Sequence, residues 1–261
     1  MSMNLTTFHT KLRQVDVFVP NDGHSGPRPV LVMHDGQNLF ENSRAGFGVS
    51  WKLPAALETV RDLGPLPVVI GPYNTGITRA AEYAPQDVIE ALPNEHYEFT
   101  GAQVLSPLTG NAYQRELVEE IIPHVATLTS LDLRRESVAL GGSSMGGLAS
   151  LYGISKHPDV YGTALCLSTH WAMSTVAFAK QFVSLLPEPS QGSRIWFDHG
   201  TEHLDATYGA IQAEVDLAVA ARGYAWPQVE SRRYIGTSHS EHAWSSRMAE
   251  ILRWWLSGIE R

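Results

Sequence analysis

Residues 137–150 read SVALGGSSMGGLAS, an apolar run followed by glycines, two serines and the start of an amphipathic stretch. Residues 138–140 are suited to a buried strand, and residues 145–156 repeat apolar side chains at three- and four-residue intervals, which predicts a helix. Between them, Ser144 has a glycine two positions away on either side. A sharp strand-to-helix turn brings the flanking residues close together, and glycine fits there because it lacks a side chain. The stretch therefore predicts a nucleophile elbow with Ser144 at its tip.

The same stretch also fits a glycine-rich turn that only packs closely, or a phosphate-binding loop. No lysine follows Gly147, so the sequence does not match a Walker loop. The close-packing turn stays open on the sequence alone. If a helix begins at the nucleophile, its first N–H groups and the positive end of its dipole point toward an oxyanion formed there. The N–H of Met145 is then the first predicted oxyanion donor.

The rest of the chain alternates short apolar runs with longer helical patterns, which predicts an α/β fold with a mainly parallel sheet and helices on both faces. Strands are predicted at residues 15–19, 30–33, 67–70, 138–140, 163–167 and 195–197, with a weaker edge strand at 229–235. Helices are predicted at residues 51–60, 115–128, 145–156, 206–221 and 241–256. Pro123 should kink or split the second helix. Residues 73–111 lack periodicity and predict a long loop over the active-site face.

Composition limits the partners that the protein can have. The 261 residues include 27 acidic and 19 basic side chains, with no basic cluster, so nucleic acid is not expected as a partner. No secretory signal and no run of 18 apolar residues is present, so we expect a cytoplasmic protein without a membrane partner, unless a signal was removed.

The lone Cys166 excludes an internal disulfide and should be a buried hydrophobe. We expect a single domain over residues 1–261, and the oligomeric state stays open, a homo-oligomer included.

A serine nucleophile needs a histidine to accept its proton and a carboxylate to orient that histidine. Where such an elbow is used, the chain order is serine, acid, histidine. Residues 234–247, YIGTSHSEHAWSSR, lie between the last predicted strand and the last predicted helix, and they offer two histidines. His239 is the predicted base, because a loop past a strand end can reach over the sheet. His242 is expected on a face of the helix.

The acid is sought in residues 195–208, IWFDHGTEHLDATY, which lead from a predicted strand into a predicted helix. Asp198 is expected to end the strand. Asp205 is the predicted acid, although it could equally cap the following helix, and Glu202 is the close alternative.

Two histidine groups could supply metal ligands. One comprises His239, Glu241 and His242, and the other comprises His199 and His203. Neither shows the H-E-x-x-H arrangement, so no metal is expected, and no other cofactor is expected either.

The second oxyanion donor is expected after an early strand. The run VLVMHDGQNLF at residues 30–40 leaves a predicted strand at His34, and Gly36 lets the backbone approach a substrate. We assign the donor to the N–H of Gly36, with Gln37 as the alternative. An ordinary turn would give the same pattern.

Six stretches together resemble the Putative esterase family of α/β-hydrolases, whose members include enterochelin esterases, feruloyl and acetyl xylan esterases and S-formylglutathione hydrolases. They are LVMHDGQNLF, ITRAAEYAP, NAYQRELVEEIIP, GGSSMGG, DHGTEHLD and GTSHSEHAW, in the family's order over nearly the whole chain. The resemblance implies an α/β-hydrolase fold and supports Ser144, His239, Gly36 and Met145 in the roles given above. It also implies a substrate pocket built from Trp51, Arg79, Tyr83, His170 and Trp171, although each aromatic fits a packing role as well.

The sequence departs from the family at the acid. The family's acid usually lies three residues after the glycine that is Gly200 here, and His203 occupies that position, with Glu202 and Asp205 beside it. The leading hypothesis is hydrolysis of a small-molecule carboxylic ester through an acyl-serine intermediate. The alternatives are acyl transfer, as in the related mycolyltransferases, and a hydrolase-fold binding protein without turnover.

Overall fold

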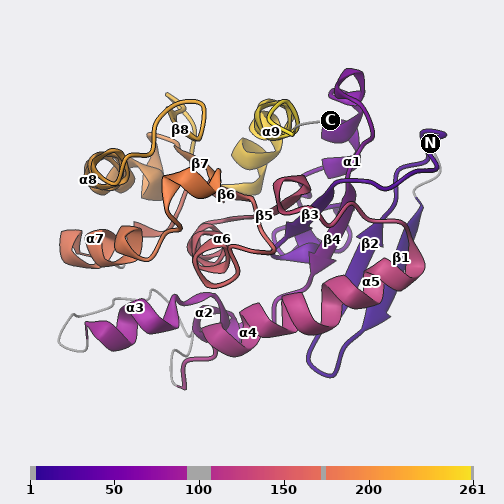
Figure 1. Cartoon of the computed structure of the whole chain (residues 1–261), viewed down its shortest axis with the longest axis horizontal. Coiled ribbons are helices and arrows are strands. Elements are labelled where there is room, and N and C mark those ends of the chain that lie inside the picture. Colours follow the sequence, from indigo (N-terminus) through magenta and orange to yellow (C-terminus); the bar gives the residue numbers. More distant parts are fainter. Residues whose placement is uncertain (1–3, 93–106, 172–174, 260–261) are drawn as a thin grey trace.

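Eight strands form one sheet in the part of the chain that the structure describes, in the order β1-β2-β4-β3-β5-β6-β7-β8 (Figure 1). The structure is a computed structural model, and it describes residues 4–92, 107–171 and 175–259. β2 pairs antiparallel with β1 and with β4, and all other neighbouring strands pair parallel. The strands are β1 (Leu5–His9), β2 (Gln14–Phe18), β3 (Val30–Met33), β4 (Val68–Pro72), β5 (Val138–Ser143), β6 (Thr163–Leu167), β7 (Arg194–His199) and β8 (Val229–Arg233).

The central strands are apolar along their length because both faces of the sheet are covered. In β3, Val30 and Val32 belong to one core, while Leu31 and Met33 belong to the other. Side chains alternate between the two faces of a strand, so each core takes every second residue. β5 and β6 contribute to both cores in the same way.

Helices form a layer on each side of the sheet (Figure 1). One core contains side chains from α2 through α8, and the other contains side chains from α1 and α9, which pack on each other. The helices are α1 (Leu53–Glu58), α2 (Arg79–Tyr83), α3 (Gln86–Ala91), α4 (Gly110–Glu116), α5 (Ile122–Leu128), α6 (Met145–Lys156), α7 (Val176–Ser184), α8 (Tyr208–Ala221) and α9 (Glu241–Leu256). The predicted α/β architecture, with helices on both faces of a mainly parallel sheet, is confirmed.

Several boundaries match the prediction, including those of β3, β6, α6 and α9. The predicted helix at 115–128 is divided, because a π-helical turn at Leu117–Ile121 separates α4 from α5, and α5 begins one residue before Pro123. β7 ends at His199 rather than at Asp198.

Four elements were not predicted. β1 and α7 were missed, and the expected loop at 73–111 contains α2 and α3. Residues 93–106 of that loop lie outside the described residues.

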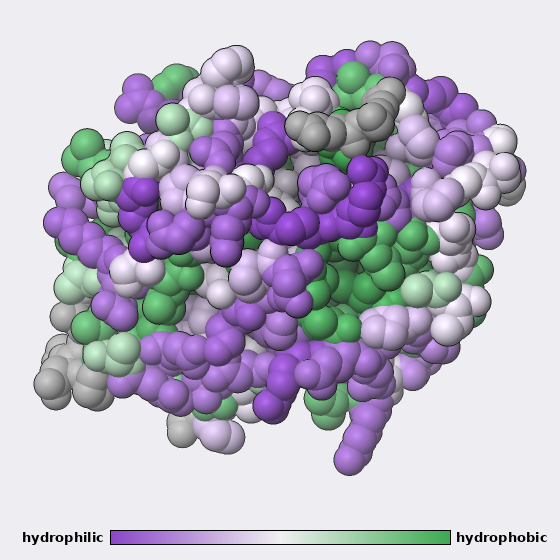
Figure 2. Space-filling model, viewed as in Figure 1, coloured by the Kyte–Doolittle hydropathy of each residue, from purple (hydrophilic) through white to green (hydrophobic). Residues whose placement is uncertain are grey.

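Cys166 is fully buried in β6, as predicted. The surface in Figure 2 is mainly hydrophilic, with apolar areas between, the broadest of them right of centre, near the region where β3 and β4 are labelled in Figure 1. Within the described ranges, no helix combines the length and apolar character that a membrane crossing needs.

Candidate active site

Ser144 lies at the turn between β5 and α6. Its backbone has φ 57° and ψ −121°, a strained conformation for a residue with a side chain. A Cβ on Gly142 would lie 3.0 Å from the backbone of Gly146, so the turn requires glycine where the chain crosses itself. The Ser144 N–H donates to the Leu167 carbonyl at 2.9 Å, and the Ser144 carbonyl accepts from the His170 N–H at 3.1 Å. The predicted sharp turn is therefore present and is fixed by β6 and the segment after it.

The N-terminus of α6 starts directly after this serine. Met145 is the first residue of the helix, so its N–H has no carbonyl partner within the helix. The free N–H and the positive end of the helix dipole favour negative charge beside Ser144. Met145 thus lies where the sequence analysis placed the first oxyanion donor.

His239 and Asp205 lie against each other. His239 Nδ1 and Asp205 Oδ1 are 2.6 Å apart, and the Asp205 side chain is fully buried. Because a carboxylate accepts hydrogen bonds, Nδ1 carries the proton and Nε2 is left as an acceptor. Glu202, the alternative acid, is exposed. The structure therefore brings Asp205, and not Glu202, to the imidazole.

Two further donors hold Asp205. The Ser168 hydroxyl and the Gly200 N–H each donate to Oδ2 at 2.7 Å. Burial by itself raises the pKa of Asp205, but the hydrogen bonds from His239, Ser168 and Gly200 outweigh it and hold the pKa below its usual value. Asp205 is thus kept as a carboxylate.

Behind Asp205 lies a buried network that the sequence did not indicate. Arg247 donates to the Ser168 hydroxyl at 2.8 Å and forms an ion pair with Asp198 at 2.7 Å. Asp198 also accepts from the Ser168 N–H at 3.0 Å. We refer to Ser168, Asp198, Asp205 and Arg247 as the Asp205 cluster. The sequence around Arg247 gives no signal for these contacts, because Ser168 and Asp198 lie in distant segments of the chain.

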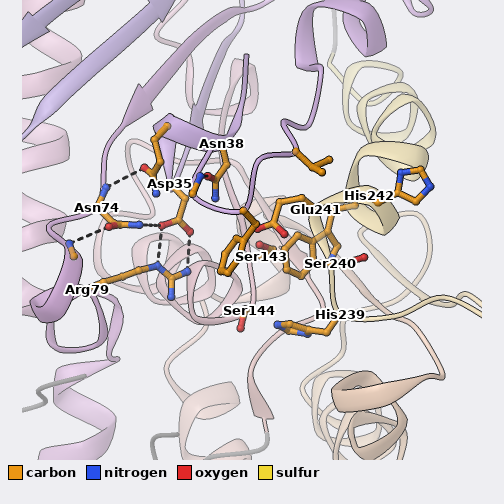
Figure 3. A pocket seen from close by; sticks show the side chains of 16 residues that line it. Asp35, Asn38, Asn74, Arg79, Ser143, Ser144, His239, Ser240, Glu241 and His242 are labelled. Carbon is orange, nitrogen blue, oxygen red and sulfur yellow. Dashed lines mark hydrogen bonds and ion pairs between the residues drawn. The ribbon is translucent and has the colours of Figure 1, made fainter. Parts of the chain in front are cut away.

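Ser144 and His239 line the same cavity, which has a volume of about 690 Å³ (Figure 3). Both side chains lie on one side of that cavity, and Ser144 is half-buried rather than sealed in the interior. His242 lies on the first turn of α9 with its ring directed away from Ser144, as expected of a residue on a helix face. The serine and imidazole that the sequence paired therefore line one cavity that is open to solvent.

On the other side of the cavity, the loop after β3 is held by a buried carboxylate. Arg79 donates to both oxygens of Asp35, at 2.8 and 2.7 Å, and Asn74 donates to one of them at 2.7 Å (Figure 3). The Tyr83 hydroxyl donates to the same carboxylate at 3.2 Å and accepts from the Asp35 N–H at 3.1 Å. We refer to Asp35, Asn74, Arg79 and Tyr83 as the Asp35 cluster. Burial raises the pKa of Asp35, but Arg79 outweighs it and the pKa is lowered.

The Asp35 cluster fixes the backbone where the second oxyanion donor was predicted. Asp35 has φ 59°, in the left-handed region, and a short 3₁₀ turn starts at Gly36. A Cβ on Gly36 would overlap the carbonyl of Gly71 in β4, so this position requires glycine. Gln37 lines the cavity. Both candidate N–H groups lie in the first turn, where they have no partner within the turn.

The residues predicted to form a substrate pocket divide into two groups. Arg79 lines the cavity. Trp51, Tyr83 and Trp171 are at most 1% exposed, belong to the two cores and are not among the cavity-lining residues. His170 is nearly buried and hydrogen-bonds the Tyr208 hydroxyl through Nδ1 at 2.8 Å. These aromatic side chains therefore pack beneath the site rather than forming its wall.

No group of three or more His, Cys, Asp or Glu side chains within residues 4–92, 107–171 and 175–259 is arranged to hold a metal ion. His199 Nδ1 instead pairs with the Gly200 carbonyl at 2.6 Å.

The parallel strands, the serine at a strained strand-to-helix turn and the histidine after the last strand define an α/β-hydrolase fold. A family model described as "Putative esterase" matches residues 9–255, and the chain belongs to this esterase family.

Individual relatives are distant. The iron(III) enterobactin esterase of Dickeya dadantii (strain 3937) is 24% identical over 245 residues, which is 88% of this chain and 48% of that protein. The uncharacterized protein YbbA of Bacillus subtilis (strain 168) is 25% identical over 178 residues, 68% of this chain and 63% of that protein. The chain thus spans about half to two thirds of the length of these relatives.

Solved structures show the same fold at low identity. An enterobactin esterase from Shigella flexneri has a TM-score of 0.67 and 17% identity, covering 98% of this chain and 60% of its own. A ferulic acid esterase has a TM-score of 0.67 and 14% identity, covering 97% of this chain and 96% of its own. An S-formylglutathione hydrolase from Agrobacterium tumefaciens has a TM-score of 0.62 and 15% identity, covering 98% and 95%.

Proposed function

We propose that this protein hydrolyses carboxylic esters of small molecules through an acyl-serine intermediate. The observation that carries the proposal is the pairing of His239 with Asp205 at 2.6 Å beside Ser144, a serine held in a strained turn at a helix N-terminus. Membership of the esterase family supports the same reaction.

In the first half of the reaction, Ser144 Oγ bonds to the ester carbonyl carbon while His239 Nε2 accepts the hydroxyl proton. Asp205 stabilises the imidazolium that forms. The negative charge on the carbonyl oxygen is stabilised by the N–H of Met145 and by that of Gly36, with Gln37 as the alternative donor. His239 then donates its proton to the alcohol oxygen as the ester bond breaks, which leaves an acyl group on Ser144.

Water completes the cycle. His239 Nε2 accepts a proton from the water as its oxygen bonds to the acyl carbon, and the imidazolium returns that proton to Ser144 Oγ as the acid leaves. His239 thus passes on each proton that it takes up within the same half-reaction, to the alcohol and then to Ser144, so the enzyme ends in its starting state without a cofactor.

The test is covalent labelling combined with turnover. A fluorophosphonate probe should label the wild type at Ser144, and Ser144→Ala should remove the label and lower kcat toward p-nitrophenyl esters by about a thousandfold or more. The neighbouring Ser143→Ala variant is a matched control and should still label. Turnover in Ser144→Ala at the wild-type rate would exclude the proposed nucleophile, and a labelled acyl acceptor would reveal transfer in place of hydrolysis.

A further inference from the structure

The wall of the cavity carries more negative than positive charge. Among the described residues that line it, the carboxylates are Asp35 and Glu241, and Arg79 is the permanent cation. Arg79 makes both of its ionic hydrogen bonds to Asp35, so that pair is close to neutral. Glu241 is left without a cationic partner.

Glu241 is buried but faces the cavity. It is the first residue of α9, two positions after His239, and it is 9% exposed while lining the space around Ser144. Figure 3 shows it across the cavity from Asp35 and Arg79. Within the described part of the chain, no hydrogen bond or ion pair joins its carboxylate to another side chain. The pKa of Glu241 is raised, because burial and the charge of Asp35 outweigh the lowering by its own backbone N–H, His239 and Arg79.

Aromatic surface lies on the same cavity. Phe47 lines it with 78% of its surface exposed, so this ring has little packing within the chain. Trp244 also lines the cavity, and its Nε1 is committed to Ser168 at 3.0 Å. Aromatic faces attract cations through the ring quadrupole, most strongly where water is excluded, and such faces recognise quaternary ammonium groups.

We infer that the cavity binds esters that carry an alkylammonium group, with Glu241 as the residue that selects for that charge and the ring of Phe47 as its aromatic contact. The inference rests on the proposed function, since it concerns the same cavity. Glu241 supplies a negative charge that no ion pair with a described residue compensates, and an ammonium placed there would supply the missing cation. An anionic group in the same position would be repelled by Glu241. Arg79 would not offset that repulsion, because it is already paired with Asp35.

The experiment compares cationic esters with their neutral isosteres and includes one anionic ester. Choline acetate is compared with 3,3-dimethylbutyl acetate, and p-nitrophenyl esters ending in trimethylammonium, tert-butyl or carboxylate are compared at equal chain length. The wild type should prefer the cationic member over its neutral isostere by roughly tenfold in kcat/KM in at least one of the two series, because a single charge pair and a cation–π contact at a partly buried site have about that effect. The carboxylate member should be the poorest substrate.

Glu241→Gln should remove this preference by lowering kcat/KM for the cationic esters about tenfold more than for their neutral isosteres. Glu120→Gln makes the same change at an exposed position outside the cavity and should keep the preference. Equal kcat/KM for cationic and neutral esters in the wild type would overturn the inference, as would a preference that persists in Glu241→Gln.

Binding measured without turnover separates this inference from the proposed function. Titration calorimetry of choline acetate and 3,3-dimethylbutyl acetate with Ser144→Ala should show tighter binding of the cation, lost when Glu241→Gln is added. Hydrolysis of neutral esters without charge preference would overturn the ammonium site and keep the esterase. Glu241-dependent ammonium binding in a protein that hydrolyses no ester would support the site and overturn the esterase.

Discussion

Two buried carboxylates flank Ser144, and their surroundings differ in one respect. Asp35 is in direct contact with a guanidinium, since Arg79 donates to both of its oxygens. Asp205 accepts from neutral groups of the protein on Oδ2 and from His239 on Oδ1. Arg247 reaches Asp205 only through the Ser168 hydroxyl, and its own charge is balanced by Asp198.

The difference separates two uses of a buried charge. A carboxylate that is neutralised by a resident cation can fix backbone, as Asp35 does for the loop that begins at Gly36. A carboxylate that has to stabilise a cation formed during a reaction must keep its charge available, and neutral donors keep it ionised without cancelling it. By this comparison, the Asp35 cluster holds the loop after β3 in place, whereas the Asp205 cluster keeps a negative charge available to His239.

The largest expected effect comes from removing the charge of Asp205 while keeping its shape. Asp205→Asn should lower kcat by about a thousandfold to ten-thousandfold, because the amide no longer stabilises the imidazolium and favours the wrong tautomer of His239. Steady-state hydrolysis of a p-nitrophenyl ester provides the measurement. Glu202→Gln is the matched control, as Glu202 is exposed and close in sequence, and it should retain activity. The opposite ranking would assign the acid to Glu202 and remove the contrast between the two clusters.

A smaller effect is expected in the Asp35 cluster. Arg79→Met should lower kcat about a hundredfold, because the loop carrying the second oxyanion donor loses its anchor, and should destabilise the fold by about 3 kcal/mol through the unpaired carboxylate. The double variant Asp35→Asn/Arg79→Met leaves no unpaired charge. The Tm of the double variant should return toward that of the wild type, while its kcat stays low. If kcat recovered together with stability, the pair would have no part in placing the loop.

The smallest effect concerns the histidines beside the two clusters. Burial lowers the pKa of His34, which precedes Asp35, to about 3, and that of His170, near Ser168, to about 4. Below pH 6.5 the unfolded chain therefore binds more protons than the folded one, so this stability is present above pH 6.5 and is lost as the pH falls. Each histidine should contribute a slope of up to about 1.4 kcal/mol per pH unit between pH 6 and 4.

Urea titrations at several pH values would measure that slope. His34→Gln and His170→Gln should each reduce it relative to wild type, whatever their effect on stability at neutral pH. A slope unchanged in both variants would show that other groups titrate in this window.

The sequence predicted the fold best for strands that are buried on both faces of the sheet. Residues 30–33 and 163–167 are uninterrupted apolar runs, and each forms a strand with the predicted bounds. β1 was missed because its exposed edge lacks apolar alternation. α2 and α3 have five and six residues, too few turns for a periodic signal. α7 did carry a signal, since Phe178 and Phe182 are spaced four residues apart and both are buried.

The site was predicted where a local pattern marks it. The glycines around Ser144 and the position of His239 after the last strand are visible in the sequence. Asp205 was favoured over Glu202 without a decisive signal, and the structure places Asp205 against His239. Ser168, Arg247 and Glu241 could not be assigned, because their partners depend on how separate loops meet in three dimensions. Trp51 and Trp171 were expected at the pocket from resemblance alone, and packing against the sheet buries them.

His239 lies on a loop that leads into α9, and α9 packs against α1, which comes much earlier in the sequence. During synthesis on the ribosome, Ser144 and the loop after β3 therefore emerge and can begin to fold well before the imidazole exists. On the proposed mechanism, the nascent chain would hydrolyse no ester until α9 docks, so the appearance of activity would report when this helix joins the sheet.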